Sequence, residues 1–258
     1  MEAVYRLEGT RAHTSKWAGG PWDRSMQHGS APTSLIARIA EHIPTLAPMR
    51  VARMTVDLMR PVPIAALDIE TEIVREGRKI QLLSIRLLAG SSEVVRASVL
   101  KIRKTDLPLP PEAGERRVGV PLPEELSDAV FGDDPVPFLA GLSLREAKGA
   151  FWALGPAAIW YRANRPIVDG EAISPLMRAA IAADFCNGAS SPLPWDAWTF
   201  INADLTITLA RDPVGEWVLL DAETWLGPEG GGIAFAKLAD SRGYFGRAVQ
   251  NLVVEKRG

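Results

Sequence analysis

Cysteine and histidine are scarce in this sequence. Its 258 residues include one cysteine, Cys186, and three histidines, which are not grouped with the spacing of a zinc site. A lone cysteine cannot form an internal disulfide, and this favours a reducing compartment. We therefore expect neither a metal site nor a disulfide framework.

An excess of one charge and long apolar runs are also missing. The formal net charge is −2 with both signs dispersed, so no nucleic-acid partner is expected. No apolar run approaches the roughly 20 residues of a membrane-spanning helix, and residues 1–17 lack the pattern of a secretory signal. Apolar residues make up 47% and charged residues 23%, as in globular proteins. We expect a soluble, cytoplasmic protein without membrane insertion.

Two common catalytic fingerprints are absent as well. The sequence has no Gly-x-Ser-x-Gly elbow of a serine hydrolase. The glycine-rich stretch GPEGGGIA, residues 227–234, leads into an expected strand rather than a helix, so it does not fit a dinucleotide site. We expect no cofactor.

The first part of the chain predicts one helix followed by four strands. Apolar residues recur at helical spacing over residues 31–43, where Pro32 suits a first helical turn. Strands are expected at residues 49–63, 67–77, 78–90 and 91–104, which are separated by Pro, Gly or Ser turn signals. We expect these strands to form an antiparallel meander.

A proline-rich, acidic stretch over residues 105–137 separates this part from a second one with the same order of elements. After it we expect a strand at 157–167 and a helix that Ser174 caps and that extends to residue 185. Four further strands are expected at 200–210, 216–226, 231–239 and 243–256. The predicted organisation is an α+β domain over 1–104, a linker over 105–137 and an α+β domain over 138–258.

This order of elements resembles the hotdog fold, and the chain as a whole resembles the TesB-like double-hotdog acyl-CoA thioesterases. The motifs that carry the resemblance are GGPWDRSMQHGSAPTSLIARIAE, MTVDLMRPVP, NADLTITL and GRAVQNLVVEKR. The resemblance implies two antiparallel sheets, each wrapping a long central helix, joined into one continuous unit. It also implies an acyl-CoA substrate and a homo-oligomer.

The resemblance further implies that an Asp, a Thr and a Gln on strands hold the attacking water. Matched to this sequence, these residues are Asp204, Thr224 and Gln250. A carboxylate can act as the general base, and the two neutral side chains can orient the water. The His and Trp-Phe-His run that follows the Asp in well-known members is replaced by residues 205–207, Leu-Thr-Ile.

The thioester carbonyl requires hydrogen-bond donors as charge develops on its oxygen. Backbone N–H groups of Gly29 and Ser30, at the start of the first helix, suit this role, and His28 could add a donor. Gly29 has no side chain to block a carbonyl that approaches the backbone. These residues could instead mark only the turn into the helix, with Ser30 as its cap.

Several of these residues also have structural explanations. Gln250 shares a strand face with apolar residues, so its amide needs a buried polar partner or a water. Thr224 is equally well explained as an ordinary strand residue. Cys186 is expected to be a small buried apolar side chain. Three arginines, Arg53, Arg60 and Arg165, are alternatives for the CoA phosphates.

Two other functions remain open. Hotdog proteins include enoyl-CoA hydratases that use an Asp and His pair, but His13, His28 and His42 all lie outside the half that contains Asp204. Such a pair would have to form between the two halves. The second alternative is a non-catalytic acyl-thioester binding protein, because a fold alone does not determine function.

Overall fold

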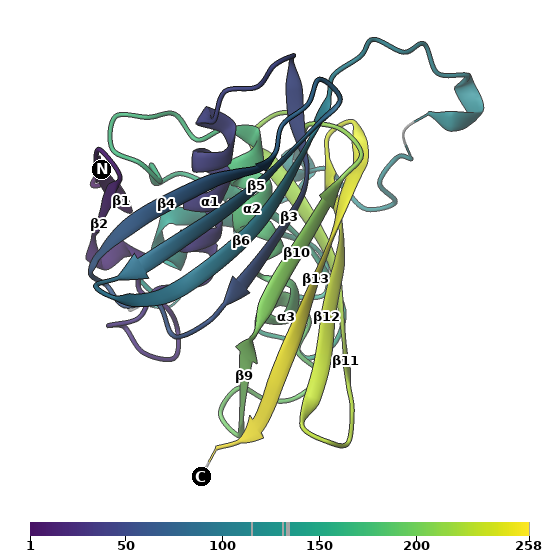
Figure 1. Ribbon diagram of the computed structural model, residues 1–258. Helices are drawn as coiled ribbons and strands as arrows, with labels where there is room; N and C mark the ends of the chain where they lie inside the picture. The colour runs from purple at the N-terminus through teal and green to yellow at the C-terminus, as the bar shows by residue number, and fades with distance from the viewer. Residues whose placement is uncertain (115, 131, 133–134, 258) are drawn as a thin grey trace.

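The part of the chain that the structure describes consists mostly of one antiparallel sheet and three α-helices, shown in Figure 1 as a computed structural model. The structure describes residues 1–114, 116–130, 132 and 135–257. The helices are α1 (Ser30–His42), α2 (Pro175–Ala183) and α3 (Cys186–Ser190), and short 3-10 turns occur at Lys16–Ala18, Pro111–Ala113, Pro123–Glu125 and Leu139–Gly141. The strands are β1 (Tyr5–Glu8), β2 (Arg11–Thr14), β3 (Met49–Leu58), β4 (Ala66–Arg75), β5 (Ile80–Ala89), β6 (Ser92–Arg103), β7 (Leu142–Lys148), β8 (Ala157–Ala163), β9 (Trp198–Asn202), β10 (Asp204–Leu209), β11 (Trp217–Leu226), β12 (Gly231–Asp240) and β13 (Gly243–Lys256).

The strand order joins the two halves of the chain into one sheet. The order is β1-β2-β4-β5-β6-β3-β10-β13-β12-β11-β8-β7, and β9 pairs with β13 outside this path. Strands β4, β5 and β6 form the predicted meander, but β3 pairs with β6 and not with β4 as predicted. The other edge of β3 is thereby free to pair with β10 of the second half. The strands of the two predicted sheets are therefore hydrogen-bonded into a single sheet through β3 and β10.

The two longer helices lie antiparallel and side by side against the sheet (Figure 1). The hydroxyl of Ser30 at the start of α1 donates to the carbonyl of Ile181 near the end of α2, at 3.0 Å. At the opposite end, Ser174 caps α2 and donates to the carboxylate of Glu41 at 2.6 Å. The start of α1 and the end of α2 therefore lie together, although they come from different halves of the chain.

The helix predicted to extend to residue 185 is shorter than expected. Helix α2 ends at Ala183, and α3 begins at Cys186 after a break at Asp184 and Phe185. The backbone carbonyl of Asp184 accepts a hydrogen bond from the Gln250 side chain at 2.9 Å. A polar partner on the sheet thus replaces the next helical hydrogen bond, and the break leaves the Asp184 side chain at the end of α2.

The N-terminal hairpin and β7 were not predicted from the sequence. Strands β1 and β2 are short and carry charged residues such as Arg6, Glu8 and Arg11, so they lack a clear apolar alternation. They are stabilised by tertiary contacts, since Tyr5 N–H donates to the carbonyl of Ile167 in the second half at 2.8 Å. No helix in the described ranges is both long and apolar enough to cross a bilayer.

Part of the predicted linker packs onto the sheet. Val118, Val120, Leu122 and Leu126 lie against a small apolar cluster that includes Trp160. The Trp160 indole also donates to the carbonyl of Pro121 at 2.9 Å. These linker residues pack on the face of the sheet opposite the helices, over β8, β11 and β12. This part of the predicted linker is therefore packed against the sheet.

Candidate active site

A cavity of about 610 Å³ lies where the two halves of the chain meet. The first half contributes the segment before α1 and the connection after β3, and the second half contributes the break between α2 and α3 together with β9. The lining residues are mostly apolar or aromatic: Gly20, Pro21, Trp22, Asp23, Met26, Gln27, His28, Gly29, Leu58, Met59, Arg60, Pro61, Val62, Asp184, Phe185, Asn187, Gly188, Trp195, Thr199, Phe200, Ile201 and Asn202. Such a lining with few polar groups is typical of a small-molecule site.

Asp184 is the most enclosed charged residue of this cavity. It is 4% exposed, and both of its carboxylate oxygens have polar contacts. Oδ2 lies 3.1 Å from the Ser30 hydroxyl and 3.0 Å from Nδ1 of His28. Oδ1 lies 3.3 Å from Nε2 of Gln250 and 3.2 Å from Nδ2 of Asn202. Since the carboxylate also faces the start of α1, the positive end of that helix favours its negative charge.

Gly29 makes this close approach possible. A Cβ atom at position 29 would lie 2.6 Å from Oδ1 of Asp184 and 2.9 Å from Oδ2. The sequence predicted that the missing side chain leaves room for a thioester carbonyl. The structure corrects this expectation, because the carboxylate of Asp184 occupies that space.

His28 has a fixed orientation at the edge of the cavity. Its ring stacks on Phe138, with 5.2 Å between ring centroids and 13° between planes, and it contacts Phe185 at 4.6 Å. Nδ1 faces Asp184, and the backbone N–H of Ser30 also points at Nδ1 from 3.2 Å. Within the described ranges Nε2 makes no hydrogen bond with the protein.

Ser30 is not the cap of α1, although the sequence left that possibility open. Gly29 is the N-cap, with no side-chain cap bond, and Ser30 is the first helical residue. The Ser30 hydroxyl lies between the Ile181 carbonyl and Asp184, so its role is to tie α1 to the end of α2. Its backbone N–H is directed at the His28 ring.

Gln250 and Thr224 lie in one row across the sheet, since Gln250 pairs with Ala234 and Ala234 pairs with Thr224. Gln250 is fully buried, and its carbonyl oxygen accepts from the N–H of Asn187 at 3.3 Å. The Thr224 hydroxyl lies 2.8 Å from that of Ser190 and 3.4 Å from the side-chain oxygen of Asn187. Both residues therefore reach the cavity only through Asp184 and Asn187, which line it.

Asp204 is on the opposite face of the sheet from Gln250. Its carboxylate accepts hydrogen bonds from the backbone and side-chain amides of Asn251, at 2.7 and 3.0 Å. Because neighbouring residues of a strand point to opposite faces, the side of Asn251 is not the side of Gln250. Asp204 and Gln250 cannot contact one water in this arrangement, and this corrects the predicted grouping of Asp204 with Thr224 and Gln250.

Sequence reasoning missed Asp184, Asn187 and Asn202. A signal for Asp184 was present, because it is an acid within the otherwise apolar helical stretch AAIAADF. A charged residue in such a position is rarely buried without partners. Asn187 and Asn202 had no comparable signal. Cys186, predicted as a buried apolar side chain, is fully buried, and burial raises the pKa of its thiol well above the usual range.

The structure separates the three arginines proposed for the CoA phosphates. Arg60 lines the cavity. Arg53 lies within the β3 part of the sheet and donates to the Ser98 hydroxyl. Arg165 is buried, donates to the carbonyl of Glu2 and stacks over Trp17 at 3.9 Å. Only Arg60 of these three is therefore placed to meet a ligand in this cavity.

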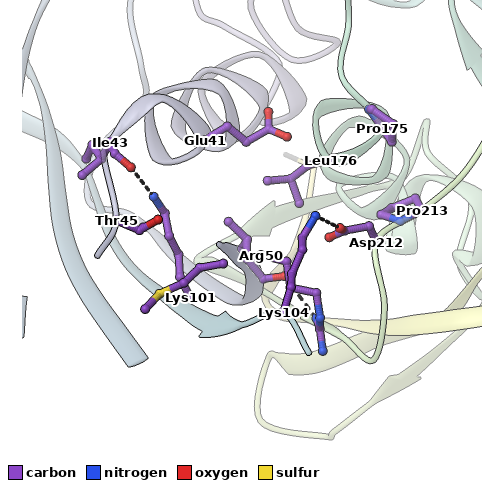
Figure 2. A pocket seen from close by; sticks show the side chains of 12 residues that line it. Glu41, Ile43, Thr45, Arg50, Lys101, Lys104, Pro175, Leu176, Asp212 and Pro213 are labelled. Atoms are coloured by element: carbon purple, nitrogen blue, oxygen red, sulfur yellow. Dashed lines mark hydrogen bonds and ion pairs between the residues drawn. The ribbon is translucent and has the colours of Figure 1, made fainter. Parts of the chain in front are cut away.

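A second cavity of about 320 Å³ lies at the opposite end of the α1–α2 pair (Figure 2). Lys101 donates to the carbonyl of Ile43 at 2.7 Å, and burial lowers the pKa of its ammonium group. Lys104 pairs with Asp212 at 2.6 Å, as Figure 2 shows. None of the residues predicted to be catalytic lines this cavity, so the larger one is the candidate site.

Two domain models of one protein family match the two halves of the chain, and the candidate cavity is lined by residues of both halves. The model of the acyl-CoA thioesterase N-terminal domain matches residues 18–102, and that of the C-terminal domain matches residues 116–254. No curated protein matches the chain.

Solved structures show the fold. A hot dog fold protein from Alicyclobacillus acidocaldarius is 16% identical with a TM-score of 0.75, over 98% of this chain and 96% of its own. The tesB protein of Mycobacterium avium subsp. paratuberculosis is 15% identical (TM-score 0.64; 97% and 95% covered). The acyl-CoA thioesterase II TesB2 of Mycobacterium marinum is 11% identical (TM-score 0.65; 94% and 98% covered). These similarities confirm the hotdog fold. The two domain matches show that the chain belongs to the acyl-CoA thioesterase family.

Proposed function

We propose that the protein hydrolyses acyl-CoA thioesters to a free acid and CoA in the 610 Å³ cavity. The observation that carries this proposal is the buried contact between Asp184 and His28 at the cavity edge, at 3.0 Å. A carboxylate and an imidazole beside an apolar cavity can activate a water, which is what thioester hydrolysis requires. The family to which the chain belongs supports thioester hydrolysis in general.

Asp184 takes the place that the sequence gave to Asp204 in this proposal. Gln250 holds Asp184 through both its backbone carbonyl and its carboxylate. Thr224 acts further away, since it contacts Ser190 and Asn187 on α3. The attacking water would lie at the cavity edge beside Asp184 and His28.

The start of α1 would stabilise the oxyanion. The backbone N–H of Gly29 makes no hydrogen bond within the described part of the chain, and it lies at the positive end of the helix. A thioester carbonyl bound there would accept this N–H as negative charge develops on its oxygen. Gly29 thus keeps the role expected from the sequence, through its N–H rather than through the space beside its Cα.

The lining of the cavity suits an acyl-CoA. Trp22, Trp195 and Phe200 form an aromatic group, with 5.6 Å between the ring centroids of Trp22 and Trp195 and 5.1 Å between those of Trp195 and Phe200. This group offers an apolar surface for the acyl chain or the pantetheine arm. Arg60 is the cation placed to meet a CoA phosphate.

A hydratase is the second candidate, and one observation favours it. The sequence indicated that an Asp and His pair would have to form between the two halves, and His28 and Asp184 make such a contact. The same pair could add water to an enoyl thioester without breaking its C–S bond. A binding protein without activity is the third candidate.

The test is release of free thiol from a panel of saturated acyl-CoAs of rising chain length, with one enoyl-CoA run in parallel. We expect thiol release from at least one saturated member, because its carbonyl would be attacked directly. Loss of the enoyl absorbance without thiol release would favour the hydratase. Binding of acyl-CoA with neither reaction would favour the binding protein, and both outcomes would contradict the proposal.

Homo-oligomer formation stays a prediction. The face of the sheet away from the helices exposes Trp225, Ile233, Val249 and Val253, which share that face across β11, β12 and β13. We propose that a second copy of the chain covers this face, since its burial would remove apolar surface from water. Light scattering on the purified protein is expected to give at least twice the monomer mass of 28.0 kDa, and a monomer would contradict it.

A further inference from the structure

We propose that the smaller cavity, at the end of α1 and the start of α2, binds a short-chain carboxylate, with its charged head beside Lys101 and its apolar chain beside Leu176. The volume of about 320 Å³ is near the lower end for small-molecule sites, so the ligand is smaller than an acyl-CoA. Such acids are also products of the proposed hydrolysis, but this site binds them whether or not the chain carries out that reaction.

The two ends of the α1–α2 pair are built alike. At the larger cavity, Ser30 at the start of α1 donates to the carboxylate of Asp184, just beyond the end of α2. At the smaller cavity, Ser174 before the start of α2 donates to the carboxylate of Glu41, near the end of α1. Each cavity therefore lies where a helix of one half begins and a helix of the other half ends. The smaller cavity has the position of a second site, and its lining decides what it can bind.

The charged part of this lining favours an anion. Three basic residues and two acidic residues line the cavity: Arg50, Lys101, Lys104, Glu41 and Asp212. Lys104 and Asp212 pair with each other, and both side chains are about half exposed. Arg50 donates to the carbonyls of Leu209 and Ala210 and has no acidic partner in the described ranges. The cavity as a whole therefore keeps an excess of positive charge.

Lys101 is the most enclosed charged residue of this cavity. The residue is 4% exposed, and its ammonium group donates to the Ile43 carbonyl at 2.7 Å (Figure 2). An ammonium group has three donors, and the other two have no acceptor in the part of the chain that the structure describes. Burial lowers the pKa of Lys101, because the charged form has lost hydration. A carboxylate in the cavity would accept from these donors in charge-assisted hydrogen bonds.

The position of the Lys101 ammonium group is fixed by contacts at the sheet. Lys101 on β6 pairs with Gln81 on β5, and both residues are buried. Gln81 donates to the carbonyl of Pro44 at 2.7 Å, and Lys101 donates to that of Ile43, the preceding residue. The two neighbours thus hold the chain that leaves α1. Because the ammonium group is in place before a ligand binds, less ordering is needed on binding.

Glu41 is the acidic residue that weakens the binding of an anion here. Its carboxylate accepts from the Ser174 hydroxyl at 2.6 Å. Partial burial raises the pKa of Glu41, so this carboxyl group takes up a proton more readily than a fully solvated one. A protonated Glu41 has an O–H donor and does not repel a carboxylate. Removal of the Glu41 charge is therefore expected to strengthen binding.

The rest of the lining is mainly apolar and suits a short carbon chain. Six residues make up this apolar part: Ile43, Met49, Val51, Pro175, Leu176 and Pro213. An inorganic anion would leave their surface in contact with water, whereas the chain of a small acid covers it. An ammonium group beside an apolar wall therefore selects a carboxylate with a short chain over phosphate.

Sodium hexanoate is the probe for this site, and isothermal titration calorimetry on the whole chain measures its binding. We expect saturable binding of hexanoate. Hexanol lacks the charge and inorganic phosphate lacks the chain, so both are expected to bind at least about 10-fold more weakly. Equal affinity for hexanol or for phosphate would overturn the inference, and so would a lack of hexanoate binding.

Lys101→Met is the first variant, because it keeps the length of the side chain and removes its charge. We expect its affinity for hexanoate to fall by about 10-fold or more. Arg60→Met is the matched control, since Arg60 is a cation that lines the larger cavity. We expect unchanged affinity in this control. Weaker binding in Arg60→Met with normal binding in Lys101→Met would place the acid in the larger cavity and overturn the inference.

Glu41→Gln is the second variant, and it decides the outcome if Lys101→Met does not fold. The Gln side chain can still accept from the Ser174 hydroxyl but carries no charge. We expect hexanoate to bind more tightly to this variant than to the wild type. Unchanged or weaker binding would contradict the proposed site. Because no measurement here depends on thiol release, a failure of this site and a failure of the proposed hydrolysis are distinguishable.

Discussion

Asp184→Asn is expected to lower the kcat of thioester hydrolysis by on the order of 10²-fold or more. The amide keeps the shape of the side chain but loses its negative charge, and its NH2 group would face other donors, such as Gln250 and Asn202. A neutral amide also cannot act as the base that takes a proton from the attacking water. Steady-state thiol release from the best acyl-CoA of the panel measures the change.

Asp204→Asn is the matched control for this prediction. Asp204 is the same residue type on the opposite face of the sheet, and it contacts Asn251 rather than the cavity. We expect its turnover to equal that of the wild type. If Asp204→Asn lost activity while Asp184→Asn kept it, the site described above would be wrong and the assignment from the sequence would be right. Thermal unfolding of both variants checks that they fold.

Gly29→Ala is expected to have an equally large effect on turnover and to destabilise the fold as well. The added Cβ would lie 2.6 Å from Oδ1 of Asp184, and Cβ atoms in proteins almost never lie within 3.0 Å of another such atom. The carboxylate cannot retreat easily, because Ser30, Gln250 and Asn202 surround it. Either the start of α1 or the end of α2 must shift. Overpacking of this kind costs about 1–3 kcal/mol of unfolding free energy.

The measurements for Gly29→Ala are kcat for thiol release and unfolding in denaturant. Gly119→Ala is the matched control, because a Cβ there has nothing within 4 Å and the residue is exposed. We expect the control to match the wild type in both measurements. Full activity in Gly29→Ala would show that the close packing of Gly29 against Asp184 is not needed for the reaction.

Local patterns of the sequence predicted most of the elements. Helix α1 and the helix that begins at Ser174 followed from apolar spacing, a capping serine and prolines in first turns, and both are confirmed. The long strands followed from alternation between turn signals, because each side chain's face depends only on its position in the strand. The need of Gln250 for a buried polar partner also followed from its apolar neighbours, and Asp184 and Asn187 meet it.

The strand pairing, the break between the helices and the grouping of the site residues depended on tertiary structure alone. The pairing of β3 with β10 and the contact of His28 with Asp184 each join residues more than a hundred positions apart. The break after α2 is held by Gln250 of β13, so no local pattern contains any of these features. The choice between Asp184 and Asp204 depended on the register of β10 and β13, where a shift of one residue exchanges the two faces of a strand. The sequence by itself therefore determined the helices, the strands and the resemblance to a family. Which carboxylate meets His28 was decided by long-range pairing and packing, because only these bring the two halves of the chain together around one cavity.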